Sequence, residues 1–224
     1  MGLDVCGCFY DVVAAVERID ADVLAMQECF RPGPGQGFAA QAAQKLGYHL
    51  YEGPFVGGDH FGTWHRVYEP DQTVATFGVT VLSRFRAENV GLVSLGKSIG
   101  DMHRAVLAVD LDVDGSPFRF CATHLAMHPH GSLREMLRLR RFRELLAGCD
   151  APAVIAGDFN MWGPMVEWLT GIDRGAFGKT WPAQRPHSQI DHLLIDGPIQ
   201  TVESRVLEPQ GSDHRPLRAV FRIP

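Results

Sequence analysis

Several acidic, amide and imidazole side chains in this sequence stand where ordinary folding gives them no obvious partner. Glu28 follows an apolar run at residues 23–26, and Asp158 follows another at residues 153–156. A carboxylate at the tip of a buried strand is costly unless another group pairs with it. Residues of this kind recur along the chain, namely Glu28, His124, Asp158, Asn160, Asp191, Asp213 and His214. We therefore expect the strands to deliver these polar groups to one active site.

These residue types together suit the hydrolysis of a phosphate ester. Glu28, Asp158 and Asp213 carry carboxylate oxygens, which are hard ligands that suit Mg²⁺ or Mn²⁺ better than zinc. Mg²⁺ takes one or two protein carboxylates and leaves positions for water and for phosphate oxygens. His124 and His214 add imidazoles for proton transfer. The set could therefore neutralise charge, activate a water and supply a proton donor.

The hydrophobic pattern predicts the elements that would position these side chains. Helical spacing predicts helices at residues 9–19, 38–46, 132–146 and 164–169. Strands are predicted at residues 23–26, 48–51, 74–83, 104–113, 118–123, 154–156, 189–195, 200–206 and 217–222. Ser132, with Glu135 three residues later, is the expected N-cap of the third helix. Residues 53–71 are polar and aromatic, and we expect them to form a long functional or mobile loop.

The order of these elements indicates the fold class. Strands and helices are mixed, and several strand pairs look like hairpins. That pattern favours two sheets packed face to face with helices outside, rather than a purely parallel sheet. At 224 residues, we expect a single domain that spans residues 1–224.

Composition limits the classes of function. The apolar fraction of 46% and the charged fraction of 21% are those of an ordinary globular protein. A formal charge of −5 gives no bulk attraction to nucleic acid, although a local basic patch stays possible. No segment approaches the ~20 consecutive apolar residues that span a membrane, and there is no secretory signal. Five scattered cysteines do not form a disulfide framework, so we expect a cytoplasmic protein, and nothing indicates an obligate protein partner.

Five motifs in sequence order resemble the signature of a known family. They are Gln27-Glu28, Thr123-His124-Leu125, Gly157-Asp158-Phe159-Asn160, Ile190-Asp191-His192 and Ser212-Asp213-His214-Arg215-Pro216. This set resembles the endonuclease/exonuclease/phosphatase superfamily, which includes deoxyribonuclease I, abasic-site endonucleases, neutral sphingomyelinases and inositol-phosphate phosphatases. The resemblance runs from about residue 9 to the C-terminus. It implies an α/β (α+β) four-layer sandwich of two packed mixed β-sheets flanked by helices, and a metal-dependent phosphoric ester hydrolase.

The resemblance also implies roles for the acidic and amide residues. Glu28 is similar to the main metal-ligating carboxylate, and Asp213 to a second metal ligand. Asp158 resembles the residue that orients or deprotonates the attacking water, and it belongs to the expected metal site as well. Asn160 resembles the residue that contacts the scissile phosphate or the metal. The expected cofactor is Mg²⁺ or Mn²⁺.

Three further residues complete the set that the resemblance implies. His214 resembles the catalytic histidine, and Asp191 would hold its ring through the far nitrogen. His124 resembles the phosphate-facing histidine of the branch that includes deoxyribonuclease I. Attack on phosphorus would be in line, without a covalent enzyme intermediate. The substrate class stays open, because a nucleic acid and a small phosphodiester or phosphomonoester are equally compatible with the sequence.

One departure from the family pattern supports a second hypothesis. The family's first strand ends in an Asn of the metal site, whereas here only residues 1–8 precede the first helix. We therefore expect the first strand to be lacking, the domain to be truncated at its N-terminus, and one sheet edge to be bare. The alternative function is a catalytically inactive family member that acts as a binding or scaffold domain.

Several prominent residues have plainer interpretations. Three arginines lie on one stripe of the third predicted helix: Arg134, Arg138 and Arg141. We expect a solvent face paired with Glu135 and Glu144, and the alternative is a patch that binds a phosphate backbone. Trp162 follows the Asp158 motif and could flank the substrate, but we expect it to pack in the core.

Overall fold

The computed structural model describes residues 2–3, 9–33, 35–56, 74–97, 101–141 and 151–224. Its helices are α1 (Val12–Ile19), α2 (Phe38–Leu46), α3 (Pro129–Leu139) and α5 (Gly163–Thr170). Most of the predicted loop at 53–71, together with Glu144, lies outside the described residues. Within the described part of the chain, no helix combines the length and the apolar character needed to cross a membrane.

The larger sheet has six strands and carries most of the predicted site residues. In spatial order they are β10 (Asp173–Arg174), β11 (Asp191–Asp196), β9 (Ala153–Asp158), β8 (Ser116–His124), β7 (His103–Val113) and β6 (Ala87–Lys97). The pair β8–β9 is parallel and the other pairs are antiparallel, so the sheet is mixed.

The facing layer consists of two smaller antiparallel sheets. One contains β3 (Val23–Arg31), β5 (Thr76–Ser83) and β4 (His49–Val56), in that spatial order. The other is the pair β12 (Gln200–Val206) and β13 (Leu217–Arg222). A short ribbon of β1 (Gly2–Leu3) and β2 (Phe9–Tyr10) precedes α1.

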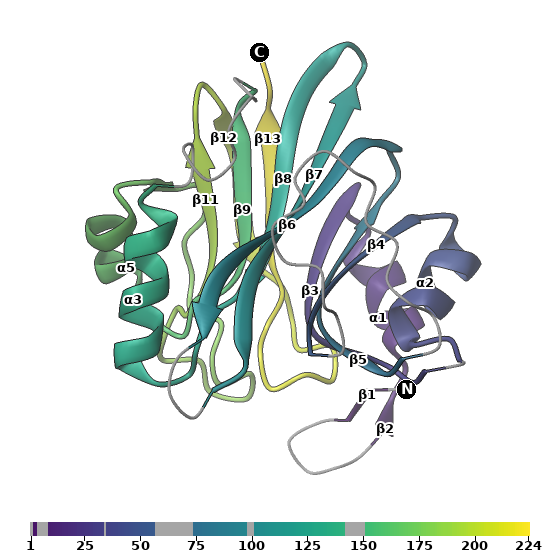
Figure 1. Ribbon diagram of the computed structural model, residues 1–224. Coiled ribbons are helices and arrows are strands. Elements are labelled where there is room, and N and C mark those ends of the chain that lie inside the picture. The colour runs from purple at the N-terminus through teal and green to yellow at the C-terminus, as the bar shows by residue number, and fades with distance from the viewer. Residues whose placement is uncertain (1, 4–8, 34, 57–73, 98–100, 142–150) are drawn as a thin grey trace.

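Alternating apolar residues hold the layers together. Val79 and Val81 of β5 and Leu107 and Val109 of β7 are fully buried in one cluster between the sheets. On the outer face of the six-stranded sheet, a second cluster packs strand residues against α3 and α5, while α1 and α2 cover β3, β4 and β5. Figure 1 shows these layers, and the expected sandwich of sheets with helices outside is confirmed.

The smaller layer is divided by a cavity. β3 and β13 each pair with a neighbour on one side only. A cavity of about 410 Å³ lies between them, lined by residues of both strands and also by Asp191 and His214. Backbone groups along these two edges therefore face a largely apolar space rather than another strand.

Several local features differ from the predictions. α3 begins at Pro129 with His128 as its N-cap, and Ser132 is buried within the helix. Glu135 is also buried, so it does not cap the helix from the surface. Strand β6 was not predicted, because its glycines and serine interrupt the apolar pattern. β3 extends five residues beyond its predicted end at Met26, through a β-bulge.

Candidate active site

Strand register places three of the predicted residues side by side. His124 ends β8 and lies opposite Asp158 at the end of β9, and Asp158 lies opposite Asp191 at the start of β11. Neighbours in one row of a sheet point to the same face. Gly157 keeps the parallel strands close, since a Cβ at this position would lie 2.1 Å from the carbonyl oxygen of Thr123.

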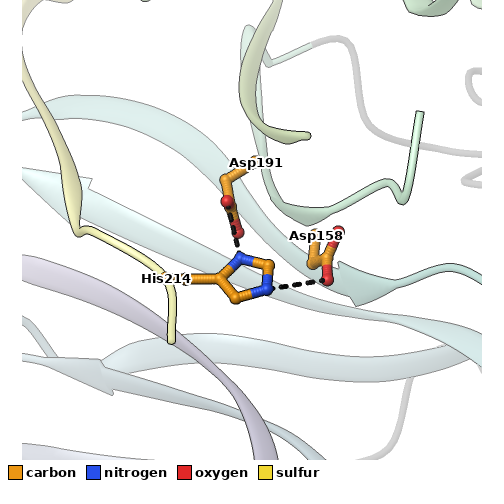
Figure 2. A group of neighbouring side chains, drawn as sticks. All are labelled: Asp158, Asp191 and His214. Atoms are coloured by element: carbon orange, nitrogen blue, oxygen red, sulfur yellow. Dashed lines mark hydrogen bonds and ion pairs between the residues drawn. The ribbon is translucent and has the colours of Figure 1, made fainter. Parts of the chain in front are cut away.

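His214 reaches this row from the loop between β12 and β13. Its Nδ1 lies 2.8 Å from Asp191 Oδ2, and its Nε2 lies 3.9 Å from Asp158 Oδ2 (Figure 2). The Asp213 carboxylate is 4.0 Å from the same Nε2. The imidazole is therefore held on one side by a hydrogen bond and faces a carboxylate on the other.

The protonation states of this pair depend on burial and on each other. Burial, and then the negative charge of Asp191, raise the pKa of Asp158 to about 7, although His214 opposes the shift. Burial alone would lower the pKa of His214, but the hydrogen bond to Asp191 and the surrounding carboxylates outweigh it and raise that pKa to about 9. Near neutral pH the arrangement thus favours an imidazolium beside a carboxyl group that can gain or lose a proton.

His124 lies in the same row, but its protonation state differs from that of His214. Its Nε2 lies 3.6 Å from Asp158 Oδ2, which is too long for a good hydrogen bond. Burial, followed by the positive charges of Arg104 and His214, lowers the pKa of His124 to about 3. The ring is therefore neutral near pH 7, and among the described residues its buried Nδ1 has no hydrogen-bond partner.

Side chains also fix the backbone that follows His124. Arg104 Nη1 donates to the carbonyl of His124 at 3.2 Å, and Asn160 Nδ2 donates to the carbonyl of Leu125 at 3.0 Å. The Ala126 amide donates to Glu135 Oε2 at 2.7 Å. Asn160, expected at the phosphate or the metal, therefore uses its amide nitrogen to hold this turn. Its carbonyl oxygen is the atom that could still serve a ligand.

Of the three expected metal ligands, only Asp158 belongs to a cluster of possible ligand atoms among the described residues. Oxygen or nitrogen atoms of Asp158, Asp191 and His214 all lie within 4.8 Å of one another. Glu28 and Asp213 are not in this group. Glu28 lies in the bulge of β3 with φ of 55°, and its charge contributes to the raised pKa of Asp158. The roles assigned to these residues from the sequence stay predictions.

The sequence did not indicate two of the residues that shape the site. Arg104 is buried and forms an ion pair with Asp101 at 2.9 Å. Glu135 was expected to pair with arginines on a solvent face, which is wrong, because the side chain is 1% exposed. Its position one turn from Leu139 on the buried side of α3 was the available signal.

Trp162 also differs from its expected position. The side chain is 66% exposed, so it does not pack in the core. It is the N-cap of α5, directly after the turn that contains Asp158 and Asn160.

Comparison with protein families identifies a match over almost the whole chain. The pattern that describes the Endonuclease/Exonuclease/phosphatase family matches residues 6–214. These bounds include every predicted site residue. A comparison with curated protein sequences found no match.

Comparison with solved structures found many similar folds. A mannosyl-6-phosphatase from Bacteroides thetaiotaomicron VPI-5482 is 16% identical, with a TM-score of 0.71 over 95% of this chain and 89% of that one. D. rerio TDP2 complexed with single strand DNA product is 15% identical, with a TM-score of 0.68 over 99% of this chain and 96% of that one. An endonuclease/exonuclease/phosphatase family protein from Leptotrichia buccalis C-1013-b is 15% identical, with a TM-score of 0.68 over 94% and 92%. At these identities the likeness shows a shared fold.

Proposed function

The chain belongs to the Endonuclease/Exonuclease/phosphatase family of hydrolases that act on phosphoesters, and from that premise we propose a divalent-metal-dependent phosphoesterase centred on Asp158 and His214. The observation that carries the proposal is the sheet register that aligns Asp158 with Asp191, combined with the 2.8 Å contact from Asp191 to His214. A purely structural role would not require a buried acid, a second, partly buried acid and an imidazole at one strand end.

Asp158 is the proposed general base. A pKa raised to about 7 by burial and by Asp191 suits a group that takes a proton from water near neutral pH. The water proton would pass to an Asp158 carboxylate oxygen as the water oxygen attacks phosphorus, in line with the departing oxygen. Asp158 Oδ1 accepts the Asn160 amide at 2.8 Å, which orients the carboxylate and leaves Oδ2 toward His214.

His214 is the proposed electrostatic partner of the phosphate. With its pKa raised to about 9, the ring carries a proton on both nitrogens, and Asp191 accepts one of them. The Nε2 proton can then be donated to a phosphate oxygen as negative charge develops there. The neutral His124 would provide a second polar contact without adding charge.

The residues present fit a hard divalent cation. Asp158, Asp191 and Glu28 place negative charge in one region, and the pKa of Asp158 is raised by both neighbours, so a cation would relieve that repulsion. We propose that Asp158 and Glu28 hold it, with Asp213 nearby, and that Mg²⁺ or Mn²⁺ is the ion. When bound, such an ion supplies charge neutralisation for the phosphate oxygens.

Hydrolysis of bis(p-nitrophenyl) phosphate with Mg²⁺ or Mn²⁺ tests the proposal. Turnover should depend on the metal and should fall at least about 100-fold in Glu28→Ala and in His214→Ala. Glu88→Gln, at an exposed position of β6, is the matched control and should retain full activity. No turnover with either metal would overturn the proposal and favour the inactive binding or scaffold domain.

The substrate is proposed only as a class. One similar fold is that of a mannosyl-6-phosphatase and another is that of TDP2 complexed with single strand DNA product, so small phosphoesters and nucleic acid are both reasonable substrates to test. A panel of plasmid, abasic-site duplex, sphingomyelin and inositol phosphates with Mg²⁺ distinguishes them.

A further inference from the structure

The most exposed side chains of α5 are apolar. The exposed residues from the N-cap to the end of this helix are Trp162, Pro164, Met165 and Trp168. Trp162 is 66% exposed and Trp168 is 73% exposed, while Val166 and Leu169 on the opposite face are buried. Single exposed apolar residues are ordinary, but two tryptophans and a methionine along one helix form a continuous stripe, which usually marks a contact surface.

α3 adds cations beside this stripe. The two helices lie side by side on the six-stranded sheet and share a buried cluster that includes Met136 and Val166 (Figure 1). The described exposed residues of α3 and of the two positions after it are Pro129, His130, Leu133, Arg134, Leu137, Arg140 and Arg141. Leu133 and Leu137 continue the apolar surface toward the arginines. The outward surface of the two helices is therefore apolar and cationic.

On the described surface of the two helices, no acidic side chain pairs with Arg134 or Arg140. Glu135 of α3 is buried and accepts the Ala126 amide. Glu167 of α5 is held at 2.9 Å by Arg174, which also stacks over Phe177. The surface is thus locally positive, although the whole chain carries a formal charge of −5.

We propose that this face, defined by Trp162, Met165, Trp168, Leu133, Leu137, Arg134 and Arg140, docks on an anionic phospholipid membrane. Tryptophan favours the boundary between headgroups and acyl chains, and arginine binds lipid phosphates. Peripheral membrane helices combine these features: apolar and aromatic residues on one side and flanking cations. A second copy of the chain would present the same positive charge, and like charges facing each other oppose association.

The proposed docking surface includes residues that follow the candidate active-site residues closely in the sequence. Met127 is 71% exposed and follows His124 by three residues, and Trp162 follows Asn160 by two. The surface is thus connected by short segments to the strand ends that carry the site. The inference goes beyond the proposed function, and it is tested by binding, without turnover.

Co-sedimentation with vesicles tests the proposal on the whole chain. Binding should be strong to vesicles of phosphatidylcholine with phosphatidylserine, weak to phosphatidylcholine alone, and weaker as salt rises. Trp168→Ser should lower the partition coefficient about tenfold or more, because a large aromatic side chain no longer inserts. Arg134→Gln with Arg140→Gln should lower binding to the anionic vesicles and flatten its salt dependence.

Matched variants separate the surface from general effects. Val202→Ser and Arg222→Gln change an exposed apolar residue and an exposed arginine on β12 and β13, and both should bind vesicles as the wild type does. Brominated acyl chains should quench tryptophan emission in the wild type and much less in Trp162→Ser/Trp168→Ser. Equal unfolding midpoints show that the variants are folded.

Three results would overturn the proposal. One is the absence of binding to either vesicle. Another is binding that survives the tryptophan and arginine substitutions. The third is a protein that does not bind vesicles and instead uses the same side chains for another contact. That contact would be with a single-stranded oligonucleotide or with a second copy of the chain. A failure of phosphoester hydrolysis would leave these measurements unaffected, so the two proposals fail separately.

Discussion

At the scale of single residues, the chemistry of the site rests on the contact between Asp191 and His214. The carboxylate accepts a hydrogen bond at 2.8 Å and fixes which ring nitrogen faces Asp158. Without it, the half-buried imidazole would lose its proton more easily, because burial opposes the charged form. Asp191 thus positions His214 and also keeps it charged.

Replacement of Asp191 by Asn should therefore lower the pKa of His214. We expect a fall from about 9 in the wild type by roughly two units or more, since the largest remaining influence is burial. NMR titration of the His214 ring in metal-free protein measures it. Asp173→Asn, at an exposed residue of β10, is the control. A His214 pKa that stays near 9 in Asp191→Asn would show that the carboxylate does not hold the proton.

Glu135 should make stability depend on pH. Burial raises the pKa of this carboxyl to about 7, above its value in the unfolded chain. Its contribution to stability is then complete below the unfolded pKa and is lost as pH rises through about 7. Glu135→Gln does not titrate and can still accept the Ala126 amide. Relative to wild type, it should gain up to about 3 kcal/mol in unfolding free energy between about pH 5 and pH 8.

Urea unfolding at several pH values measures this gain. Glu88→Gln, which changes an exposed glutamate of β6, is the matched control. A difference between Glu135→Gln and wild type that stays constant with pH would contradict the prediction.

At the scale of elements, the bulge in β3 decides where Glu28 lies. Register is regular up to Met26, which pairs with Thr80, and resumes at Cys29, which pairs with Gly78. Gln27 and Glu28 therefore oppose a single residue, and Glu28 adopts φ of 55°. A left-handed conformation at a non-glycine residue costs on the order of 1–2 kcal/mol. The strain allows the edge strand to present a carboxylate near Asp158.

Two substitutions at this bulge separate strain from chemistry. Glu28→Gly and Glu28→Ala both remove the carboxylate, so both should lose metal-dependent turnover. Glu28→Gly should unfold with a free energy about 1 kcal/mol higher than Glu28→Ala, because glycine adopts this φ freely. At Gln27 the order of the unfolding free energies should be reversed, so that Gln27→Ala is more stable than Gln27→Gly. Equal stability of the two Glu28 variants would mean that the bulge is not strained.

The sequence predicted the elements that follow simple periodicity and missed those set by tertiary contacts. The bounds of α2 agree with prediction, because apolar spacing and Gly47 mark them locally. The bulge in β3 has no local signal, since it depends on pairing with β5. Asp158, Asp191 and His214 were predicted from motifs and come together in the fold. Arg104 could not be predicted as a support of His124, because its partner carbonyl lies on another strand.

At the scale of the whole molecule, the residues of the proposed site come from three separate sheets. Asp158 and Asp191 come from the six-stranded sheet, Glu28 from the three-stranded sheet, and His214 from the loop before β13. These sheets come together only in the folded protein, so a cation held by residues from all of them would bind the folded state and not the unfolded chain. Metal binding should therefore stabilise the whole fold.

Mn²⁺ or Mg²⁺ should raise the unfolding temperature. At about 100 times the dissociation constant, the expected gain is roughly 2.7 kcal/mol, or on the order of 5–10 °C for a chain of this size. Chelation should reverse the shift, and Glu28→Ala and Asp158→Asn should reduce it. Thermal unfolding followed by circular dichroism measures it, with Asp173→Asn as the control. An unfolding temperature insensitive to divalent ions would contradict a metal site.

The cavity between β3 and β13 separates the β12–β13 ribbon, whose loop carries His214, from the neighbouring sheet. Among the described strands, the β12–β13 ribbon forms backbone ladders only within itself. Its loop is tied to residues 180–183 by backbone hydrogen bonds from Ala183 to Asp213 and from Arg215 to Thr180, so we expect the ribbon and that segment to open together while the six-stranded sheet stays intact. Amide protons of β12 and β13 should exchange with deuterium sooner than those of β7 and β8. Inactivation in denaturant would then precede global unfolding, because swinging the ribbon outward takes the imidazole out of reach of both aspartates.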